Sequence, residues 1–474
     1  MKNMTLQNIA AACQGKLVYR DPSGNLAADK EITGVVIDSR KLEPGNLFIA
    51  VRGEKVDGHS FISQVMENGA AAVVCEEVPE VVPTAFILVK DSLKALREMA
   101  IFYRSQINIT IVGITGSVGK TSSKEFIAAT LEVRYRVLKT EGNYNNEIGL
   151  PLMILKIRKQ HEVAVLEMGI SDFGEMHRLS EMARPDVAVL TNIGDCHLEH
   201  LSDRAGVLKA KSEIFDFLAS DGHVVLNGDD ILLRSIAAVN GKVPLRFGIW
   251  KENDIVAELI RSLELNGTFI EIEFTQSGEA FEVNVPLPGE HMIYNALAAA
   301  TVGNLLGLEA EEIQAGIENM KSVPGRSHIM RMPWGYLIDD CYNANPVSMK
   351  AAIKLLKSVK GRKVAILGDM LELGAEEQKL HAQIGREVIA AGIDVLICIG
   401  KLSLFMYEAA FTANEYLKEH CMGNYELYYF PDKNSFLDAV GDILFACDTV
   451  LMKASRGMAF ETMIEVLKED SFYL

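Results

Sequence analysis

Residues 113–121 read Gly-Ile-Thr-Gly-Ser-Val-Gly-Lys-Thr, and this glycine-rich run constrains the fold more than any other segment. An apolar stretch containing Ile109 and Ile111 precedes it, and residues 122–131 have the composition of a helix. The run therefore joins a strand to the start of a helix, where bare backbone N–H groups and the positive end of the helix dipole bind phosphate. The segment predicts an α/β domain that binds a nucleotide.

The residue types within this loop predict separate roles. A strict phosphate loop would carry glycine at position 114, where Ile114 stands, so the motif is a variant. The alternative is a glycine-rich turn that binds no ligand. In the nucleotide reading, the backbone cradle, the phosphate-binding lysine and the magnesium-binding hydroxyl are supplied by Gly116, Ser117, Val118, Gly119, Lys120 and Thr121.

Length and charge narrow the class of protein. The 474 residues are enough for about three domains. The net charge of −17 argues against nucleic acid or an anionic membrane as the main partner. Residues 1–20 are expected to form a short amphipathic helix, and no apolar span of membrane length occurs, so we expect a cytoplasmic protein. Seven cysteines without a C-x-x-C pair favour reduced thiols over disulfides or a zinc site.

The pattern of apolar runs divides the chain into three predicted α/β domains. Residues 1–90 form a small N-terminal domain with strands at 34–37, 47–50 and 72–75, ending near residues 82–83. Residues 91–322 form a central ATPase-like domain with a parallel sheet, which contains the phosphate loop, buried strands at 163–167, 187–191 and 223–226, and antiparallel strands within 255–285. Residues 323–474 form a doubly wound, Rossmann-like domain with strands at 336–340, 363–367, 395–399, 426–430 and 450–453.

Two polar residues follow strands of the central domain, at the edge where the phosphate loop is expected, and two lysines lie on a later helix. Glu167 closes one strand, and its carboxylate can hold Mg²⁺, although a solvated glutamate is the simpler alternative. His197 follows the next strand and could contact a metal, although a lone histidine is more often structural. Lys209 and Lys211 are two residues apart and so lie on different helix faces, where solvated lysines are usual.

Motifs along nearly the whole chain resemble the Mur ligase family in order and spacing. Ile170 and Asp172 depart from the residues common in the family at those positions. The matching segments are GITGSVGKT itself, EGNYNNEIGLP at 141–151, LEMGISDFGE at 166–175, ARPDVAVLTNIG at 183–194, HLEHL at 197–201, AKSEIF at 210–215, PGR at 324–326, DDCYNANP at 339–346, LGDMLELG at 367–374 and DSRKLEPGNLFIAVRGEKVDGHSFI at 38–62.

The resemblance implies an ATP-dependent amide ligase of peptidoglycan precursor synthesis. Such an enzyme phosphorylates a carboxylate, and an amine then displaces the phosphate. The N-terminal and C-terminal motifs are most similar to the branch that joins D-alanyl-D-alanine to UDP-N-acetylmuramoyl-tripeptide. The branch that adds a single amino acid typically carries Asp-Asn-Pro-Arg, which is missing from this sequence. That branch and a folylpolyglutamate synthetase-like ligase remain the alternatives.

The resemblance also implies roles for individual residues. Thr121 and Glu167 would hold one Mg²⁺, and His197 with a carbamylated Lys211 would serve a second. The implied catalytic residues are Lys120, Lys211 and His197. Asn295 would contact adenine, and Arg326 and Asp340 the phosphate and ribose of ATP. The candidates for the UDP end of the substrate are Ser39, Arg40, Asp57 and His59, and those for the peptide and the amine are Asn145, Asn146, Tyr342, Asn343, Asn345 and Arg456.

Each substrate candidate could instead be a polar residue that caps a loop. Two further classes of protein stay open. A GTP-driven switch would normally carry Asn-Lys-x-Asp, which the sequence lacks. A non-catalytic protein of the same fold would have no need of the full set of phosphate-binding and metal-binding residues. We expect the enzyme to act as a monomer.

Overall fold

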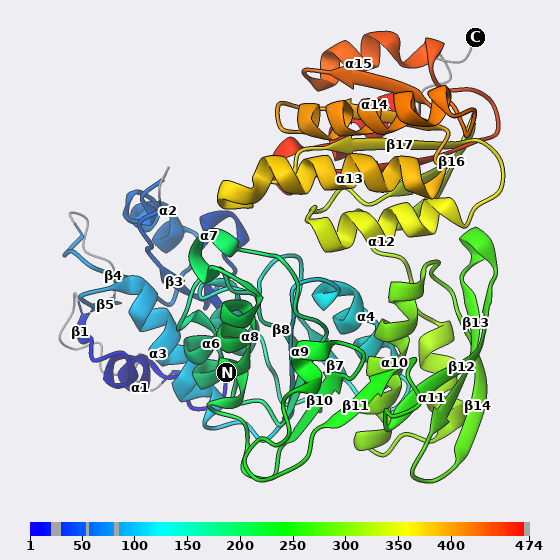
Figure 1. The fold of residues 1–474 in the computed structure, drawn as a ribbon. Coiled ribbons are helices and arrows are strands. Elements are labelled where there is room, and N and C mark those ends of the chain that lie inside the picture. Colours follow the sequence, from blue (N-terminus) through cyan, green and yellow to red (C-terminus); the bar gives the residue numbers. More distant parts are fainter. Residues whose placement is uncertain (20–29, 54–55, 80–84, 469–474) are drawn as a thin grey trace.

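The computed structural model describes residues 1–19, 30–53, 56–79 and 85–468, which form three α/β domains along the chain (Figure 1). Each domain is built on its own sheet, with strands within 16–88, 110–285 and 328–453. The α/β class with three sheets agrees with the sequence analysis. The boundaries at residues 90 and 322 stay predictions, and the expected end of the first block at 82–83 lies outside the described residues.

The N-terminal sheet has the strand order β1-β5-β4-β3-β2, in which only β1 is antiparallel. The expected amphipathic helix within residues 1–20 is present but shorter than predicted, because it spans Leu6–Ala12 and a strand begins at Lys16. Gly15 permits this turn, since a Cβ there would lie 2.6 Å from Ile87 Cγ2 of the neighbouring strand. The elements are α1 (Leu6–Ala12), β1 (Lys16–Tyr19), β2 (Val35–Val36), β3 (Leu47–Ile49), α2 (Ile62–Glu67), β4 (Ala72–Cys75) and β5 (Ala85–Leu88).

The central sheet has the order β14-β13-β12-β11-β10-β9-β6-β8-β7, parallel from β7 to β12 and antiparallel from β12 to β14. Strand β6, which leads into the phosphate loop, pairs with β8 and β9 on either side. The elements are α3 (Ser92–Arg104), β6 (Thr110–Thr115), α4 (Lys120–Leu131), β7 (Val137–Lys139), α5 (Gly149–Leu155), β8 (Val163–Glu167), α6 (Glu175–Ala183), β9 (Val187–Leu190), α7 (Leu198–Leu201), α8 (Arg204–Ser212), β10 (His223–Asn227), α9 (Ile231–Arg234), β11 (Leu245–Gly248), β12 (Ile255–Ser262), β13 (Thr268–Phe274), β14 (Glu279–Val285), α10 (Glu290–Leu305) and α11 (Ala310–Glu318).

The C-terminal sheet has the order β15-β16-β20-β17-β18-β19 and buried apolar clusters on both faces. It is parallel except for β15, an edge strand that the sequence analysis did not predict and that pairs with β16 as a hairpin. The elements are β15 (His328–Met332), β16 (Gly335–Asp339), α12 (Pro346–Lys357), β17 (Lys363–Gly368), α13 (Glu377–Ala391), β18 (Val395–Ile399), α14 (Ser403–Glu419), β19 (Glu426–Phe430), α15 (Lys433–Ala439), β20 (Asp448–Lys453) and α16 (Glu461–Leu467).

The three domains are not equally joined. One apolar cluster runs from Met4 and Ile9 of the N-terminal domain through Leu96 to Met153 and Leu179 of the central domain. The buried members of the C-terminal clusters all belong to that domain, although Leu265 of the central domain packs against one cluster. The C-terminal domain lies above the central domain in Figure 1. The first two domains therefore share a core, whereas the third is attached as a separate body. Within the described chain, we find no helix of sufficient length and apolarity to cross a membrane.

Candidate active site

A cavity of about 440 Å³ opens between the central and C-terminal domains. This volume is in the usual range for a small-molecule site. Its walls come from the phosphate loop and the start of α4, from α10, from residues 325–327, from the loop that follows β16 with the start of α12, and from the end of β20. The cavity thus lies beyond the carboxyl ends of parallel strands in two sheets, where ligands of open α/β domains bind.

The phosphate loop depends on two glycines with positive φ. Gly116 has φ 154°, and a Cβ there would lie 1.9 Å from Thr191 Oγ1, while Gly119 at the start of α4 has φ 81°. Lys120 Nζ donates to the Gly116 carbonyl at 2.8 Å, so the ammonium is held over the loop. Burial lowers the pKa of Lys120, and Glu167 opposes that shift. Ser117, Val118, Gly119, Lys120 and Thr121 all line the cavity.

The residues beside the loop have the oxygen donors that Mg²⁺ needs. Thr121 Oγ1 donates to Glu167 Oε2 at 2.9 Å, and Asn145 Nδ2 donates to the other oxygen of this carboxylate at 2.8 Å. Glu167 is 2% exposed. No cluster of three or more His, Cys, Asp or Glu side chains suited to a metal occurs in the described residues. One hydroxyl and one buried carboxylate fit Mg²⁺, which keeps waters and takes further ligands from phosphates.

His197 and Lys211 do not line the cavity. Lys211 is 1% exposed, and its ammonium has no hydrogen bond or ion pair within the described part of the chain. Burial, together with the charge of Lys120, lowers the pKa of Lys211 to about 8. Burial and the charges of Lys211 and Lys120 lower the pKa of His197 to about 4, so its imidazole is neutral. Lys209 instead lies 5.7 Å from the Phe173 ring centroid.

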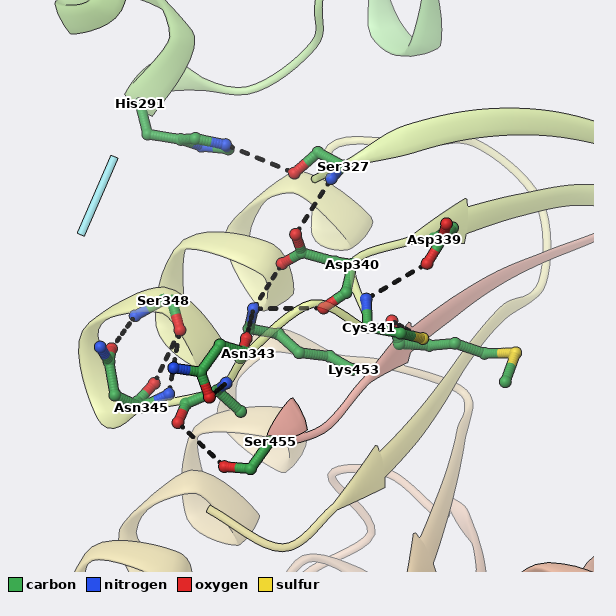
Figure 2. Close-up of polar contacts among 12 residues, drawn as sticks. His291, Ser327, Asp339, Asp340, Cys341, Asn343, Asn345, Ser348, Lys453 and Ser455 are labelled. Carbon is green, nitrogen blue, oxygen red and sulfur yellow. Dashed lines mark hydrogen bonds and ion pairs between the residues drawn. The ribbon is translucent and has the colours of Figure 1, made fainter. Parts of the chain in front are cut away.

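Residues 325–327 bring Arg326 of the C-terminal side to the phosphate loop. One Nη of Arg326 donates to Thr121 Oγ1 at 2.9 Å, and its guanidinium lies 3.8 Å from the Tyr342 ring centroid. Its Nε is buried without a hydrogen-bond partner in the described structure. The backbone amides on either side of Arg326 donate to two successive carboxylates. The Gly325 amide donates to Asp339 at 2.8 Å, and the Ser327 amide donates to Asp340 at 3.0 Å (Figure 2). A cation is thereby fixed opposite the loop.

Asn295 lines the cavity, but its amide is already engaged. Its oxygen accepts from Ser123 Oγ at 2.8 Å, and its nitrogen lies 3.4 Å from Met292 Sδ. The bond from Ser123 ties α10 to α4. The expected contact of Asn295 with adenine stays a prediction. The sequence analysis missed several neighbours that form this wall, namely Asn227, Phe247, His291 and Tyr294.

The candidates for the peptide and the amine separate into two groups. Asn145, Tyr342, Asn343 and Asn345 line the cavity, and Asn345 also caps α12 by accepting from the Ser348 amide at 2.9 Å. Two others lie outside the lining. Asn146 caps α5 by accepting from the Gly149 amide at 2.9 Å, and Arg456 pairs with Glu461 at 3.1 Å, 5.6 Å from the Tyr342 ring centroid.

The four candidates in the N-terminal domain do not reach this cavity. Ser39 and Arg40 lie in a short 3₁₀ turn, where Arg40 pairs with Asp38 through bonds of 2.9 and 2.8 Å and lowers the pKa of that carboxyl to about 2. His59 Nδ1 lies 2.7 Å from Asp57, and its Nε2 accepts from the Glu76 amide at 3.0 Å. Their role in binding the UDP end stays a prediction.

Two of the lining residues that we missed could have been found from the sequence, because each is a polar residue at the end of a predicted strand. Asn192 follows β9, and its amide oxygen accepts from the Val118 amide of the phosphate loop at 3.0 Å. Lys453 ends β20 and lines the cavity. Both positions close strands that the sequence predicted, so the strand-end argument applied to Glu167 would have found them.

Comparison with known proteins gives the family. Residues 31–117 match the model described as Mur ligase family, catalytic domain, residues 114–303 the Mur ligase middle domain, and residues 325–456 the Mur ligase, glutamate ligase domain. The UDP-N-acetylmuramoyl-tripeptide–D-alanyl-D-alanine ligase of Bacillus subtilis (strain 168) is 38% identical, with 99% of each chain covered. This chain belongs to the Mur ligase family. The ligase of the same description in Escherichia coli (strain K12) is 35% identical to this Mur ligase, again with 99% of each chain covered.

Solved structures agree with this assignment. The crystal structure I of MurF from Acinetobacter baumannii has a TM-score of 0.86 at 30% identity and covers 98% of this Mur ligase and 99% of that chain. MurF ligase from Thermotoga maritima in complex with ADP has a TM-score of 0.80 at 29% identity, covering 92% and 97%. A folylpolyglutamate synthase from Mycobacterium tuberculosis reaches a TM-score of 0.60 at 16% identity, which shows a shared fold alone.

Proposed function

We propose that this Mur ligase joins D-alanyl-D-alanine to UDP-N-acetylmuramoyl-tripeptide with conversion of ATP to ADP and phosphate, in peptidoglycan precursor synthesis. The proposal is supported by full-length similarity to ligases of that description. The main structural support is the hydrogen bond from Arg326 to Thr121. This bond brings the Arg326 guanidinium of the C-terminal domain to the same phosphate-binding loop as the Lys120 ammonium of the central domain.

The first step activates the carboxylate of the tripeptide. Its oxygen attacks the γ-phosphorus of ATP, and the bond from that phosphorus to the β-γ bridging oxygen breaks to release ADP. Charge on the phosphoryl group is stabilised by the loop amides, by Lys120 and by Arg326. Thr121 and Glu167 would hold Mg²⁺, which neutralises phosphate charge when bound. The half-buried Asn145 amide keeps the buried Glu167 carboxylate in place.

The second step forms the amide. The amine nitrogen of the dipeptide attacks the acyl carbon, the tetrahedral intermediate collapses, and the carbon–oxygen bond to phosphate breaks while the nitrogen loses a proton. Because acyl phosphates react with water, the site must be closed when the intermediate forms. The C-terminal domain carries Arg326 and the loop with Asn343, so its approach completes the site and covers it.

Lys211 is proposed to act as a carbamate. A buried amine with no partner and a lowered pKa is neutral often enough to add CO₂: a nitrogen–carbon bond forms, one proton leaves, and a carboxylate results. That carboxylate, with His197, would suit a second Mg²⁺. Lys211→Ala should be inactive and partly rescued by small carboxylates. Isotopically labelled CO₂ should give a carbamate signal by NMR in the wild type and none in Lys211→Ala. Full activity of Lys211→Ala would refute this role.

The acceptor is the part of the proposal that one assay tests. D-Alanyl-D-alanine has a methyl side chain, and the cavity offers it the uncharged amides of Asn343 and Asn345 rather than the arginine motif of the single-amino-acid branch. ADP release from a UDP-muramoyl-tripeptide should require the dipeptide. The matched control supplies UDP-muramoyl-dipeptide with free diaminopimelate or lysine, which should give no product. Extension by one amino acid would refute the dipeptide assignment and leave the Mur ligase assignment intact.

A cytoplasmic location and a monomeric state stay predictions. So do the binding of the UDP end by the N-terminal domain and the division of the chain at residues 90 and 322.

A further inference from the structure

Lys453 lies at the carboxyl end of β20 and lines the cavity, but the roles assigned above do not include it. The residue is 2% exposed. Its ammonium donates to Asp340 Oδ2 at 2.6 Å and to the Asn343 carbonyl at 2.8 Å, with the Asp340 carbonyl at 3.5 Å (Figure 2). One buried cation therefore holds the two ends of the loop that follows β16.

These two partners belong to different halves of the site. Asp340, through its other carboxylate oxygen, accepts from the Ser327 amide at 3.0 Å, next to Arg326. Ser327 Oγ in turn lies 3.5 Å from His291 Nε2 on α10 of the central domain. On the other side, Asn343 begins the turn that reaches Asn345 at the start of α12. The contacts run without a break from the nucleotide side to the acceptor side.

Stability alone is a poor reason for this arrangement. Removing an ammonium from water costs several kcal/mol, and apolar replacements of buried ion pairs are often neutral or stabilising. The ammonium provides hydrogen-bond donors that an apolar residue lacks, and it can bind a carboxylate and a carbonyl at the same time. A buried ion pair with these partners fixes the direction of Asp340 and the path of the loop.

We propose that Lys453 is a positioning residue that holds the nucleotide-binding carboxylate and the acceptor-binding loop in one geometry. The inference rests on the proposed function, in which Asn343 faces the dipeptide, and on the contact with ATP that the family resemblance implies for Asp340. Without the ammonium, Asp340 loses a fixed partner and the Asn343 carbonyl loses its donor. Both halves of the site then loosen together, whereas the distant N-terminal domain is untouched.

The test compares Lys453→Gln with Lys453→Arg, which keeps the charge, and with the control Lys433→Met. Lys433 is a suitable control because it lies in the same domain, donates to the Ala459 carbonyl and Thr462 Oγ1, and does not line the cavity. In Lys453→Gln we expect the KM values for ATP and for D-alanyl-D-alanine each to rise by about fivefold or more, and ADP affinity by calorimetry to fall by a similar factor. The KM for the UDP-tripeptide should stay within twofold.

Lys453→Arg should restore at least half of each loss, and Lys433→Met should match the wild type. A uniform fall in kcat with all three KM values unchanged would overturn the proposal, as would an effect on one substrate alone. If Lys453→Gln melts early, Asp340→Asn breaks the same pair, and the double variant Asp340→Asn/Lys453→Gln should then be no worse than the poorer single variant. Additive losses would also overturn the proposal. The wild-type acceptor assay is separate, so failure of the proposed function would be visible before any variant is made.

Discussion

The cavity between the central and C-terminal domains and the polar cluster of the N-terminal domain contain similar residue types but connect them differently. In the cavity, hydrogen bonds join positions far apart in the chain, such as Arg326 to Thr121 and Lys453 to Asp340. In the N-terminal cluster, charged residues pair within two positions, Arg40 with Asp38 and His59 with Asp57. The first region is assembled by long-range contacts, whereas the ion pairs of the second lie within local turns and His59 adds one longer-range bond, from the Glu76 amide.

The cations of the cavity are fixed before a ligand binds. The charged residues of the N-terminal cluster must first give up their present partners. Lys120 is held by the Gly116 carbonyl of its own loop, and Arg326 is held by Thr121 and the Tyr342 ring, so both cations are preorganised to stabilise charge. Arg40 is exposed and pairs with one carboxylate that a phosphate could displace. We therefore expect large losses of rate from substitutions in the cavity and moderate losses of affinity from substitutions in the N-terminal cluster.

The largest effect should come from Lys120→Ala. Removing a cation opposite the transferring phosphoryl group should lower the ligation rate by about 100- to 1,000-fold, on the order of 3 to 4 kcal/mol. Phosphate release with all substrates present measures it. Lys209→Ala is the control, since the Lys209 ammonium lies over the Phe173 ring and does not line the cavity. Turnover of Lys120→Ala near the wild-type rate would refute the phosphate-loop assignment.

Substitutions of Tyr342 should have a smaller effect, and they should distinguish the contribution of its ring to ADP binding from that of its hydroxyl. The Arg326 guanidinium is 3.8 Å from the ring centroid, and a desolvated contact of this kind contributes roughly 1 to 2 kcal/mol. Tyr342→Leu should weaken ADP binding by about tenfold in calorimetry, while Tyr342→Phe should stay within twofold. If both variants lose equally, the hydroxyl and not the ring is what matters, and Tyr342 contacts a substrate directly.

The N-terminal cluster should respond in substrate affinity alone. In Ser39→Ala/Arg40→Ala, the KM for the UDP-peptide should rise by several-fold, about the worth of one or two charge-assisted hydrogen bonds. The KM for ATP should stay within twofold, because these residues are separate from the cavity. Equal changes in both KM values would contradict a separate site for the UDP end.

The smallest effect concerns stability in acid. Glu147 lies between Arg97 and Arg178, with bonds of 2.9 and 3.1 Å. Burial opposes its ionisation, but the two guanidiniums outweigh burial and lower its pKa below the usual 4.5. Its stabilisation is therefore present above about pH 4.5 and disappears as the pH falls through the lowered pKa. At neutral pH, Glu147→Gln should lower the free energy of unfolding by about 1 kcal/mol, seen as a lower melting temperature. The difference in melting temperature between variant and wild type should shrink towards pH 3. A constant difference would refute the charge-based origin.

The sequence predicted the parts of the fold that depend on local pattern. Apolar runs of β6, β8 and β9 and the alternation of the third domain were confirmed, because buried parallel strands are continuous apolar segments. The strand β1 was missed because its four residues follow a helix closely, and only the partner β5 explains why they extend. Glu167 was found because it closes a strand. The contact of Arg326 with Thr121 was not predictable, since it depends on how two domains meet. The partners of Lys453 were not predictable either, since they depend on β16 pairing with β20 in the C-terminal sheet.

The shared core of the first two domains has a consequence for which donors this ligase accepts. Because the apolar cluster from Met4 to Leu179 is continuous, the N-terminal domain and the phosphate loop keep a constant separation. If the N-terminal domain binds the UDP end and the carboxylate is phosphorylated at the phosphate loop, that separation fixes the length of peptide that can span the two sites. A donor one residue shorter would leave its carboxylate short of the γ-phosphate, whatever its side chains, so chain length would be selected by distance alone.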